Sequence, residues 1–284
     1  MATPNSNEAE LNLQGKLFRD GPLEQNLIWN CGEVAAAGDS HVGMVRENNQ
    51  DSIAIDKKLG IYLVADGMGG RAGGEIASRL AVSSIIEEVS NKLSNLYAGD
   101  IAYKKTALAQ TVNAASLRIY ERSLELPQFR GMGTTTTLLW LPPGQNSDAK
   151  YGNYGLVAHV GDSRCYLLRA GLLYQITEDH SLVNEQIKAG VLKKNDPLAS
   201  QIRNVITRCV GYQEEEEVDT FAFECLKGDK FLLCSDGLTN KVRDIEIAQA
   251  LSALTPELAP AHLISMANER GGEDNISVVV AYLN

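Results

Sequence analysis

Cysteine chemistry is what this sequence supports least. Its five cysteines, at positions 31, 165, 209, 225 and 234, are odd in number and form no C-x-x-C pair. This pattern argues against a disulfide framework and against a zinc–thiolate site. None of the five is followed six positions later by arginine, so the cysteine-dependent C-x5-R phosphatase loop is absent. We interpret all five as packing residues in a protein of a reducing compartment.

Histidine and long apolar runs are also scarce. The 284 residues include only four histidines and no His-x-Glu or Glu-x-x-His pattern, which disfavours a zinc site. Nowhere do 18 apolar residues run together, and the first residues lack the apolar run of a signal peptide, so we expect a cytoplasmic protein. A net charge of −10 argues against a general nucleic-acid binder and against a protein of anionic membrane surfaces.

What the sequence does contain is aspartate at the ends of apolar, strand-like runs. Asp66 and Asp236 each follow such a run and precede a glycine, Asp274 comes just before one, and Asp162 lies between two. Taken singly, an Asp-Gly or Asp-Asn pair is more often an ordinary turn. A carboxylate fixed at a strand end, with the carbonyl of Gly67 beside it, can nevertheless bind a hard cation. Four such aspartates, far apart in sequence, are what a folded oxygen-rich metal site requires.

Eight short segments carry a wider pattern: Arg46–Asp51, Val64–Gly70, Gly131–Thr135, Val160–Arg164, Thr177–Ser181, Arg203–Arg208, Cys234–Gly237 and Glu273–Ser277. In this order they resemble the metal-dependent protein serine/threonine phosphatases of the protein phosphatase 2C family, in their bacterial form. One segment alone would be a weak match, whereas the ordered set is specific. The resemblance extends from about Gly32 to the last residue.

The periodicity of apolar residues predicts an α+β fold. Apolar residues recur every three or four positions from Gly73 onward, and again between residues 100 and 126, which predicts two long helices. Runs of strands with short connections favour a mainly antiparallel arrangement. The resemblance sharpens this to a four-layer α-β-β-α sandwich of two mainly antiparallel sheets flanked by helices. Among the expected elements are a strand over 60–65, a short helix over 181–189 capped by Ser181, and a helix over 256–270 capped by Thr255.

We expect three parts along the chain. Residues 1–30 are polar with few apolar anchors and are expected to form a flexible N-terminal extension. Residues 31–284 would form the phosphatase 2C-like catalytic domain. The resemblance implies a flap beside the active site, at about residues 181–213.

The resemblance also implies a metal site of two core Mn²⁺ or Mg²⁺ ions and a weaker third. Asp66 would bridge the core pair, with the Gly67 carbonyl on one side and Asp236 and Asp274 on the other. Asp162, sharing Asp236, would hold the third ion. Carboxylate and carbonyl oxygens are the ligands that these hard cations prefer.

Three further positions have roles by the same resemblance. Asp51 would hold a metal-bound water without touching the metal, and Arg46 would grip the substrate phosphate, for which a planar guanidinium is well suited. Arg46 could equally form a surface ion pair of little worth. Met68 stands where eukaryotic relatives carry a histidine proposed to protonate the leaving group, so the general acid is unassigned. His180 lies in a matched segment, or it stabilises a loop there.

These residues predict hydrolysis of phosphoserine and phosphothreonine in proteins by a metal-activated water, without a covalent phosphoenzyme. The expected partners are phosphoproteins modified by a serine/threonine kinase, with no nucleic acid or membrane, and the expected state is a monomer. A catalytically inactive phosphoprotein-binding regulator is one alternative, which the intact aspartates argue against. A two-metal phosphodiesterase is another, disfavoured by the acidic charge and the lack of a basic groove.

Overall fold

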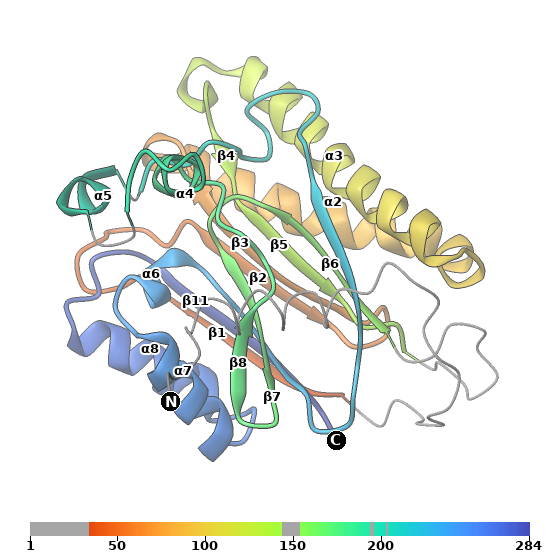
Figure 1. The fold of residues 1–284 in the computed structure, drawn as a ribbon. Coiled ribbons are helices and arrows are strands. Elements are labelled where there is room, and N and C mark those ends of the chain that lie inside the picture. Colours follow the sequence, from red (N-terminus) through yellow and green to blue (C-terminus); the bar gives the residue numbers. More distant parts are fainter. Residues whose placement is uncertain (1–33, 144–153, 194–195, 203) are drawn as a thin grey trace.

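The computed structural model describes residues 34–143, 154–193, 196–202 and 204–284. Two antiparallel sheets pack face to face, and helices cover both outer faces (Figure 1). This arrangement confirms the predicted α+β fold and its four layers. Among the described residues no helix combines the length and the apolar character that crossing a bilayer requires.

The first sheet carries two long helices on its outer face. Its strand order is β2 (Asp51–Asp56), β3 (Ile61–Met68), β5 (Thr136–Trp140), β6 (Tyr154–Val160) and β9 (Asp219–Glu224), and the short β4 (Gly133–Thr134) pairs with the end of β3. The covering helices are α2 (Gly70–Ala98) and α3 (Ile101–Glu125), followed by the 3₁₀ turn η1 (Pro127–Phe129). Because strand side chains alternate, Leu63 packs under these helices while Tyr62 and Val64 face the other sheet.

The second sheet is covered by three shorter helices. Its strand order is β1 (Val34–His41), β11 (Ile276–Leu283), β10 (Lys230–Cys234), β7 (Arg164–Arg169) and β8 (Leu172–Gln175), and its helices are α6 (Asp236–Thr239), α7 (Asp244–Ala253) and α8 (Ala259–Glu269). Every residue of β11 is buried. Val278 and Val280 pack against the helices, whereas Val279 packs between the sheets. A strand buried on both faces explains the unbroken apolar run at the end of the sequence.

A segment outside both sheets lies at one end of the sandwich. It contains α4 (Leu182–Lys188) and α5 (Pro197–Ile202), which Figure 1 shows at the same end as β4. An isolated β-bridge between Ser181 and Ile206 joins the two ends of this segment. The Ser181 hydroxyl accepts a hydrogen bond from the Asn184 amide and caps α4, as the sequence predicts.

Two predicted boundaries are wrong, one because of a distant strand and one because of a local turn. The third strand does not stop at residue 65, because Gly67 and Met68 still pair with β4, so Asp66 lies inside β3. The last helix begins at Ala259 and not at residue 256. The amides of Leu258 and Ala259 both donate to the Thr255 carbonyl and close a separate turn before the helix starts.

The start of α2 approaches the metal-site strand very closely. A methyl group added at Gly74 would lie 2.7 Å from the backbone carbonyl of Gly67 and 2.9 Å from the Gln50 side chain. At these distances backbone must move, because a Cβ cannot stand that close to a carbonyl group. The two glycines therefore let α2 pack directly on the end of β3.

We expect Gly74→Ala to destabilise the protein by about 2 kcal/mol, since overpacking here outweighs the roughly 1 kcal/mol that alanine gains over glycine in a helix. Thermal unfolding of the variant measures this, with the exposed Ser83→Ala on the same helix as the control. A midpoint above that of the wild type would contradict the close approach.

Candidate metal centre

Asp66 and Asp51 lie directly opposite each other across the β2–β3 pair. Both backbone groups of Asp66, its amide and its carbonyl, form hydrogen bonds. Its amide donates to the Thr135 hydroxyl at 2.9 Å, and its carbonyl accepts from the Thr135 amide at 2.8 Å and from the Thr134 hydroxyl at 2.9 Å. Residues opposite one another in an antiparallel pair share one face of the sheet, so the two carboxylates are neighbours.

The carboxylate of Asp51 is buried and only partly satisfied. Its Oδ2 accepts from the Ser235 hydroxyl at 2.8 Å, while its Oδ1 is buried and has no hydrogen-bond partner. Ser235 immediately precedes Asp236, so this bond joins the two sheets next to a second candidate ligand. A buried oxygen without a partner is costly and indicates that something else, such as a water or an ion, satisfies it.

The loop that carries Arg46 is fastened by Asn275. The Asn275 side chain donates to the carbonyls of Val42 and Asn48 at 2.9 and 3.0 Å, and accepts from the Gln50 amide at 2.8 Å. The guanidinium of Arg46 donates to Asp274 at 2.9 Å, and 54% of its side chain remains exposed. The three bonds of Asn275 therefore hold this loop against the start of β11.

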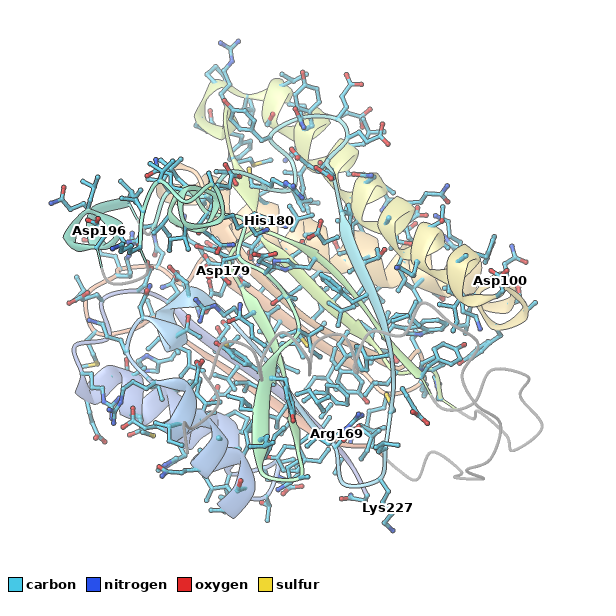
Figure 2. The ribbon with its side chains drawn as sticks, in the orientation of Figure 1. Asp100, Arg169, Asp179, His180, Asp196 and Lys227 are labelled. Carbon is cyan, nitrogen blue, oxygen red and sulfur yellow. The ribbon has the colours of Figure 1, made fainter. Side chains whose placement is uncertain are left out.

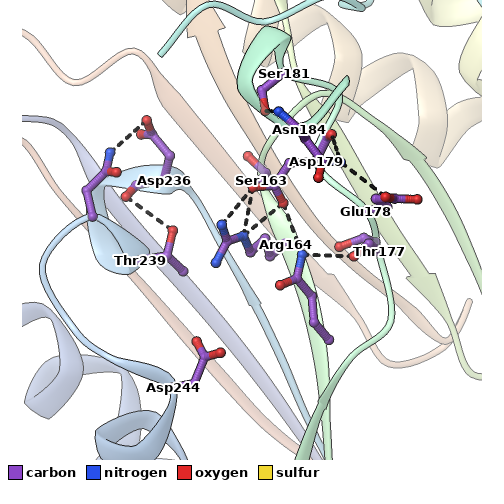
Figure 3. A network of polar contacts seen from close by, with 12 residues as sticks. Ser163, Arg164, Thr177, Glu178, Asp179, Ser181, Asn184, Asp236, Thr239 and Asp244 are labelled. Atoms are coloured by element: carbon purple, nitrogen blue, oxygen red, sulfur yellow. Dashed lines mark hydrogen bonds and ion pairs between the residues drawn. The ribbon is translucent and has the colours of Figure 1, made fainter. Parts of the chain in front are cut away.

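Asp162 lies in the turn between β6 and β7, and Asp236 is the first residue of α6. Asp236 accepts from the Asn240 side chain at 3.0 Å through its Oδ2 (Figure 3). Beside the turn, Arg164 forms a fork of hydrogen bonds to both oxygens of Asp179, with the shortest at 2.7 Å (Figure 3). That paired arginine fixes the start of β7, and with it the end of the turn that carries Asp162.

These groups converge on one pocket of about 620 Å³. Of the predicted site residues, six line it: Arg46, Asp66, Gly67, Asp162, Asp236 and Asp274. Asp51 lies behind them, beside Asp66. Met68 and Thr135 line the pocket as well, and Asn204 and Ile206 contribute to it from the segment that contains α4 and α5.

The electrostatics of the pocket reflect crowded negative charge. Loss of water raises the pKa of Asp66 well above its ordinary range, and the carboxylates of Asp51 and Asp236 raise it further. Burial also raises the pKa of Asp162 to about 7, with Asp236 adding to the effect. For Asp51, burial outweighs the hydrogen bonds from serine hydroxyls and raises the pKa to about 6. Each shift means that the folded protein resists placing another negative charge here.

The donor set fits hard divalent cations. It consists of carboxylate and carbonyl oxygens, and Asp51, whose buried Oδ1 has no hydrogen-bond partner, lies opposite Asp66 in the strand pair. Across the described ranges, however, no three histidine, cysteine, aspartate or glutamate side chains stand in an arrangement that could hold a metal ion. Asp274 is turned onto Arg46 and Asp236 onto Asn240, so both would have to turn to meet a cation.

Comparison with known proteins now decides the family. A family model described as protein phosphatase 2C matches residues 37–273, which is most of the chain. The chain belongs to the protein phosphatase 2C family. The serine/threonine phosphatase stp of Listeria innocua is 35% identical to it over 246 residues, covering 85% of this chain and 93% of that protein. The resemblance read from the eight ordered segments is thereby confirmed.

Solved structures of the family agree with the fold. The crystal structure of the Mycobacterium tuberculosis serine/threonine phosphatase PstP/Ppp matches with a TM-score of 0.76 at 33% identity, covering 88% of this chain and 99% of that one. A structure of the PstP catalytic domain in complex with two manganese ions matches with a TM-score of 0.74 at 34% identity, covering 88% and 97%.

Sequence reasoning did not assign roles to three residues of this phosphatase that position the aspartates. Thr135 holds the Asp66 backbone, Ser235 binds Asp51, and Asn275 fastens the Arg46 loop. All three lie inside the matched segments, where Ser235 and Asn275 each adjoin an aspartate and Thr135 ends the segment Gly131–Thr135. The available signal was a small polar residue inside each of these segments. From the sequence alone, such a residue is interpreted as part of an ordinary turn, because its hydrogen-bond partner lies far away along the chain.

Four of the five cysteines are confirmed as buried free thiols, at positions 165, 209, 225 and 234, and Cys31 lies outside the described residues. Burial raises the pKa of the Cys209 thiol to about 12, which keeps it protonated and unreactive.

Replacing Thr135 with valine should weaken the site without changing its shape. Valine matches threonine in volume but cannot accept from the Asp66 amide or contact the Ser163 hydroxyl, which lies 2.7 Å away. We expect a loss of about 1–3 kcal/mol in unfolding free energy and a fall in kcat of about tenfold. Thr135→Ser keeps the hydroxyl and should retain most of both. Equal behaviour of the two variants in chemical denaturation and phosphatase assays would contradict the role of the hydroxyl.

The raised pKa values predict how stability depends on pH when metal is removed with EDTA. Because the folded state binds these protons more tightly than the unfolded state, unfolding free energy is highest at low pH and falls as pH rises towards the folded pKa of Asp162. Between about pH 5 and pH 8 we expect the unfolding free energy to fall by an amount on the order of 2 kcal/mol. Thermal unfolding of the metal-free protein at several pH values measures this fall. Asp162→Asn removes one of these groups and should flatten the profile. A midpoint that rises over this range would contradict the assignment.

Proposed function

We propose that this chain, a metal-dependent protein serine/threonine phosphatase by family, hydrolyses phosphoserine and phosphothreonine esters at the pocket of aspartates. The observation that carries the proposal is the convergence of four aspartates, from separate strand and helix ends, on one pocket. Phosphate monoester hydrolysis needs an activated water, neutralised phosphoryl oxygens and an in-line geometry. The residues present are suited to provide all three.

We propose that the aspartates hold Mn²⁺ or Mg²⁺ in the way that the resemblance implies. Asp66 would bridge two core ions, with the Gly67 carbonyl serving one and Asp236 and Asp274 the other. Asp162 would share Asp236 to hold a third, weaker ion. Bound there, the ions supply neutralising charge and an activated water for attack on phosphorus. The neighbouring carboxylates that raise the pKa of Asp66 support cation binding. Their mutual repulsion is reduced either by protonation or by a bound cation, and only the cation leaves the carboxylates ionised.

The remaining residues bind and orient the substrate. Arg46 is half-exposed and paired with Asp274, so a substrate dianion can replace that carboxylate as its partner. Its guanidinium stays charged and offers two parallel donors to a phosphate. Asp51, which is buried behind Asp66, would accept from the attacking water through its partnerless Oδ1. Met68 lines the pocket but has no proton to transfer, so it shapes the site and does not protonate the leaving group.

The wider setting is part of the same proposal. We propose a catalytic domain over 31–284, an N-terminal extension over 1–30 that lies outside the described residues, and a flap over about 181–213. We also propose that the protein acts as a cytoplasmic monomer on phosphoproteins made by a serine/threonine kinase. Its net charge of −10 supports the absence of nucleic-acid and membrane partners.

An assay with three substrates tests the function. With Mn²⁺ we expect hydrolysis of p-nitrophenyl phosphate and of a phosphothreonine peptide, and little hydrolysis of bis-p-nitrophenyl phosphate. Asp236→Asn should lower kcat by about 10³-fold or more while the fold stays intact, because an amide neither carries charge nor shares two cations. Circular dichroism and thermal unfolding check the fold of the variant.

Three results would overturn the proposal. Binding of phosphopeptide without turnover would make the protein a regulator, and preference for the diester would make it a phosphodiesterase. Full turnover after exhaustive EDTA treatment would remove the metal from the mechanism.

A further inference from the structure

We propose that His180 is a positioning residue that ties the flap to the turn carrying Asp162. Through this tie, the position of the flap sets the position of Asp162. The inference rests on the proposed role of Asp162 in the reaction. The hydrogen bonds that carry it involve neither a metal nor a substrate.

His180 binds both backbone groups of the residue before Asp162. Its amide donates to the Gly161 carbonyl at 2.8 Å, and its ring Nδ1 accepts from the Gly161 amide at 3.1 Å. Only 7% of His180 is exposed, so water does not compete for these bonds. Gly161 has a φ of +111°, and a Cβ there would stand 2.6 Å from the Thr135 side chain. The turn therefore requires glycine, which has no side chain of its own to hold it in place.

The other side of the His180 ring is fixed by β9. The ring Nε2 lies 3.3 Å from Asp219 Oδ2, and Arg208 donates to Asp219 Oδ1 at 3.1 Å. Because Nδ1 accepts from Gly161, Nε2 carries the ring proton and donates to Asp219. This hydrogen bond also helps to hold the pKa of Asp219 below its ordinary value. The ring is thus oriented from both of its nitrogens.

The backbone of His180 belongs to the base of the flap. The Thr207 amide donates to the His180 carbonyl at 2.9 Å, and the Leu182 amide donates to the Val205 carbonyl at 2.8 Å. These bonds flank the bridge between Ser181 and Ile206. Figure 2 shows His180 at the foot of the flap, between α4 and the strands of the first sheet. One residue therefore contacts the flap with its carbonyl and the Asp162 turn with its amide and ring.

The far side of the turn is held independently of the flap. The Ser163 hydroxyl lies 2.7 Å from that of Thr135, and the Ser163 carbonyl accepts from the Thr137 hydroxyl at 3.0 Å. Both threonines belong to the rigid sheet region around β5. Asp162 therefore lies between an anchor that belongs wholly to the sheet and a second anchor, His180, which contacts both the flap and Asp219 of β9.

The neighbouring His159 does not transfer protons to or from His180. The His159 ring lies 4.9 Å from that of His180, fully buried, and its Nδ1 is 3.0 Å from the Thr137 hydroxyl. Burial lowers the pKa of His159 to about 3, so this ring is neutral at physiological pH and packs against His180.

Amide hydrogen exchange on the metal-free wild-type protein provides the first test. If His180 joins the two elements, the Gly161 amide should open together with the flap amides of Leu182 and Thr207, with protection within about threefold of theirs. Exchange of Gly161 at the much slower rate of the β6 interior would overturn the proposal. Since no metal or substrate is present, this result is independent of whether the proposed function is correct.

A pair of substitutions provides the second test. In His180→Asn the side-chain oxygen lies near the Nδ1 position and can still accept from the Gly161 amide. In His180→Gln the side-chain amide takes the place of Nε2, and the Gly161 amide loses its hydrogen-bond partner. We expect His180→Gln to speed Gly161 exchange and to lower kcat, each by about tenfold, as one lost hydrogen bond would do. KM for p-nitrophenyl phosphate should stay within about twofold, because the Arg46 contact is untouched. His180→Asn should restore most of both.

The control is Lys188→Ala, which removes an exposed flap ion pair with Glu178 and should change neither readout. Lower kcat in His180→Gln with unchanged Gly161 exchange would show that His180 does not act through the turn. Equal loss in the asparagine and glutamine variants would show that the ring only fills space. Either result overturns the proposal, and the exchange measurement on the wild type decides if a variant fails to fold.

Discussion

Two carboxylates placed directly opposite each other across a strand pair are the constraint on which this structure depends. The register of β2 on β3 sets Asp51 against Asp66, and like charges in that position destabilise a sheet. The fold tolerates them through hydroxyl donors to Asp51 and through raised pKa values, which favour the protonated, uncharged forms. Two carboxylates this close together favour the binding of positive charge. Under the proposed function, cation binding would neutralise this negative charge and would link stability and chemistry at the same residues.

The rest of the scaffold keeps these carboxylates from moving apart. Asp66 is bound through its backbone by Thr134 and Thr135, which fixes the position of its Cα in the pocket wall. Ser235 links the two sheets through Asp51, and Asn275 holds the loop that carries Arg46 with three hydrogen bonds. Small polar side chains thus join elements that lie far apart in the sequence. The turn of Asp162 differs, because it is bound on one side by Thr135 and Thr137 and on the other by His180.

Much of the fold could be predicted because its signals are local. The apolar run of β11, the spacing of apolar residues in α2 and α3 and the Ser181 cap each follow from a few neighbouring residues. One of the two wrong boundaries arose where a distant partner decided the outcome. Asp66 looked like the residue after a strand, yet β4 extends β3 past it, and β4 is some seventy residues further along the chain.

The sequence by itself determined which chemistry is available: aspartates and one arginine in ordered segments, with no thiol or histidine site to compete. Only the tertiary structure decided which of these groups meet. Strand register put Asp51 behind Asp66, and the folding of the chain brought Asp162 and Asp274 to the same pocket. It also placed His180 between Thr207 and the Gly161 turn. Such contacts join residues far apart along the chain, and no local pattern specifies them, since a polar residue in a turn has the same sequence signature with or without a partner.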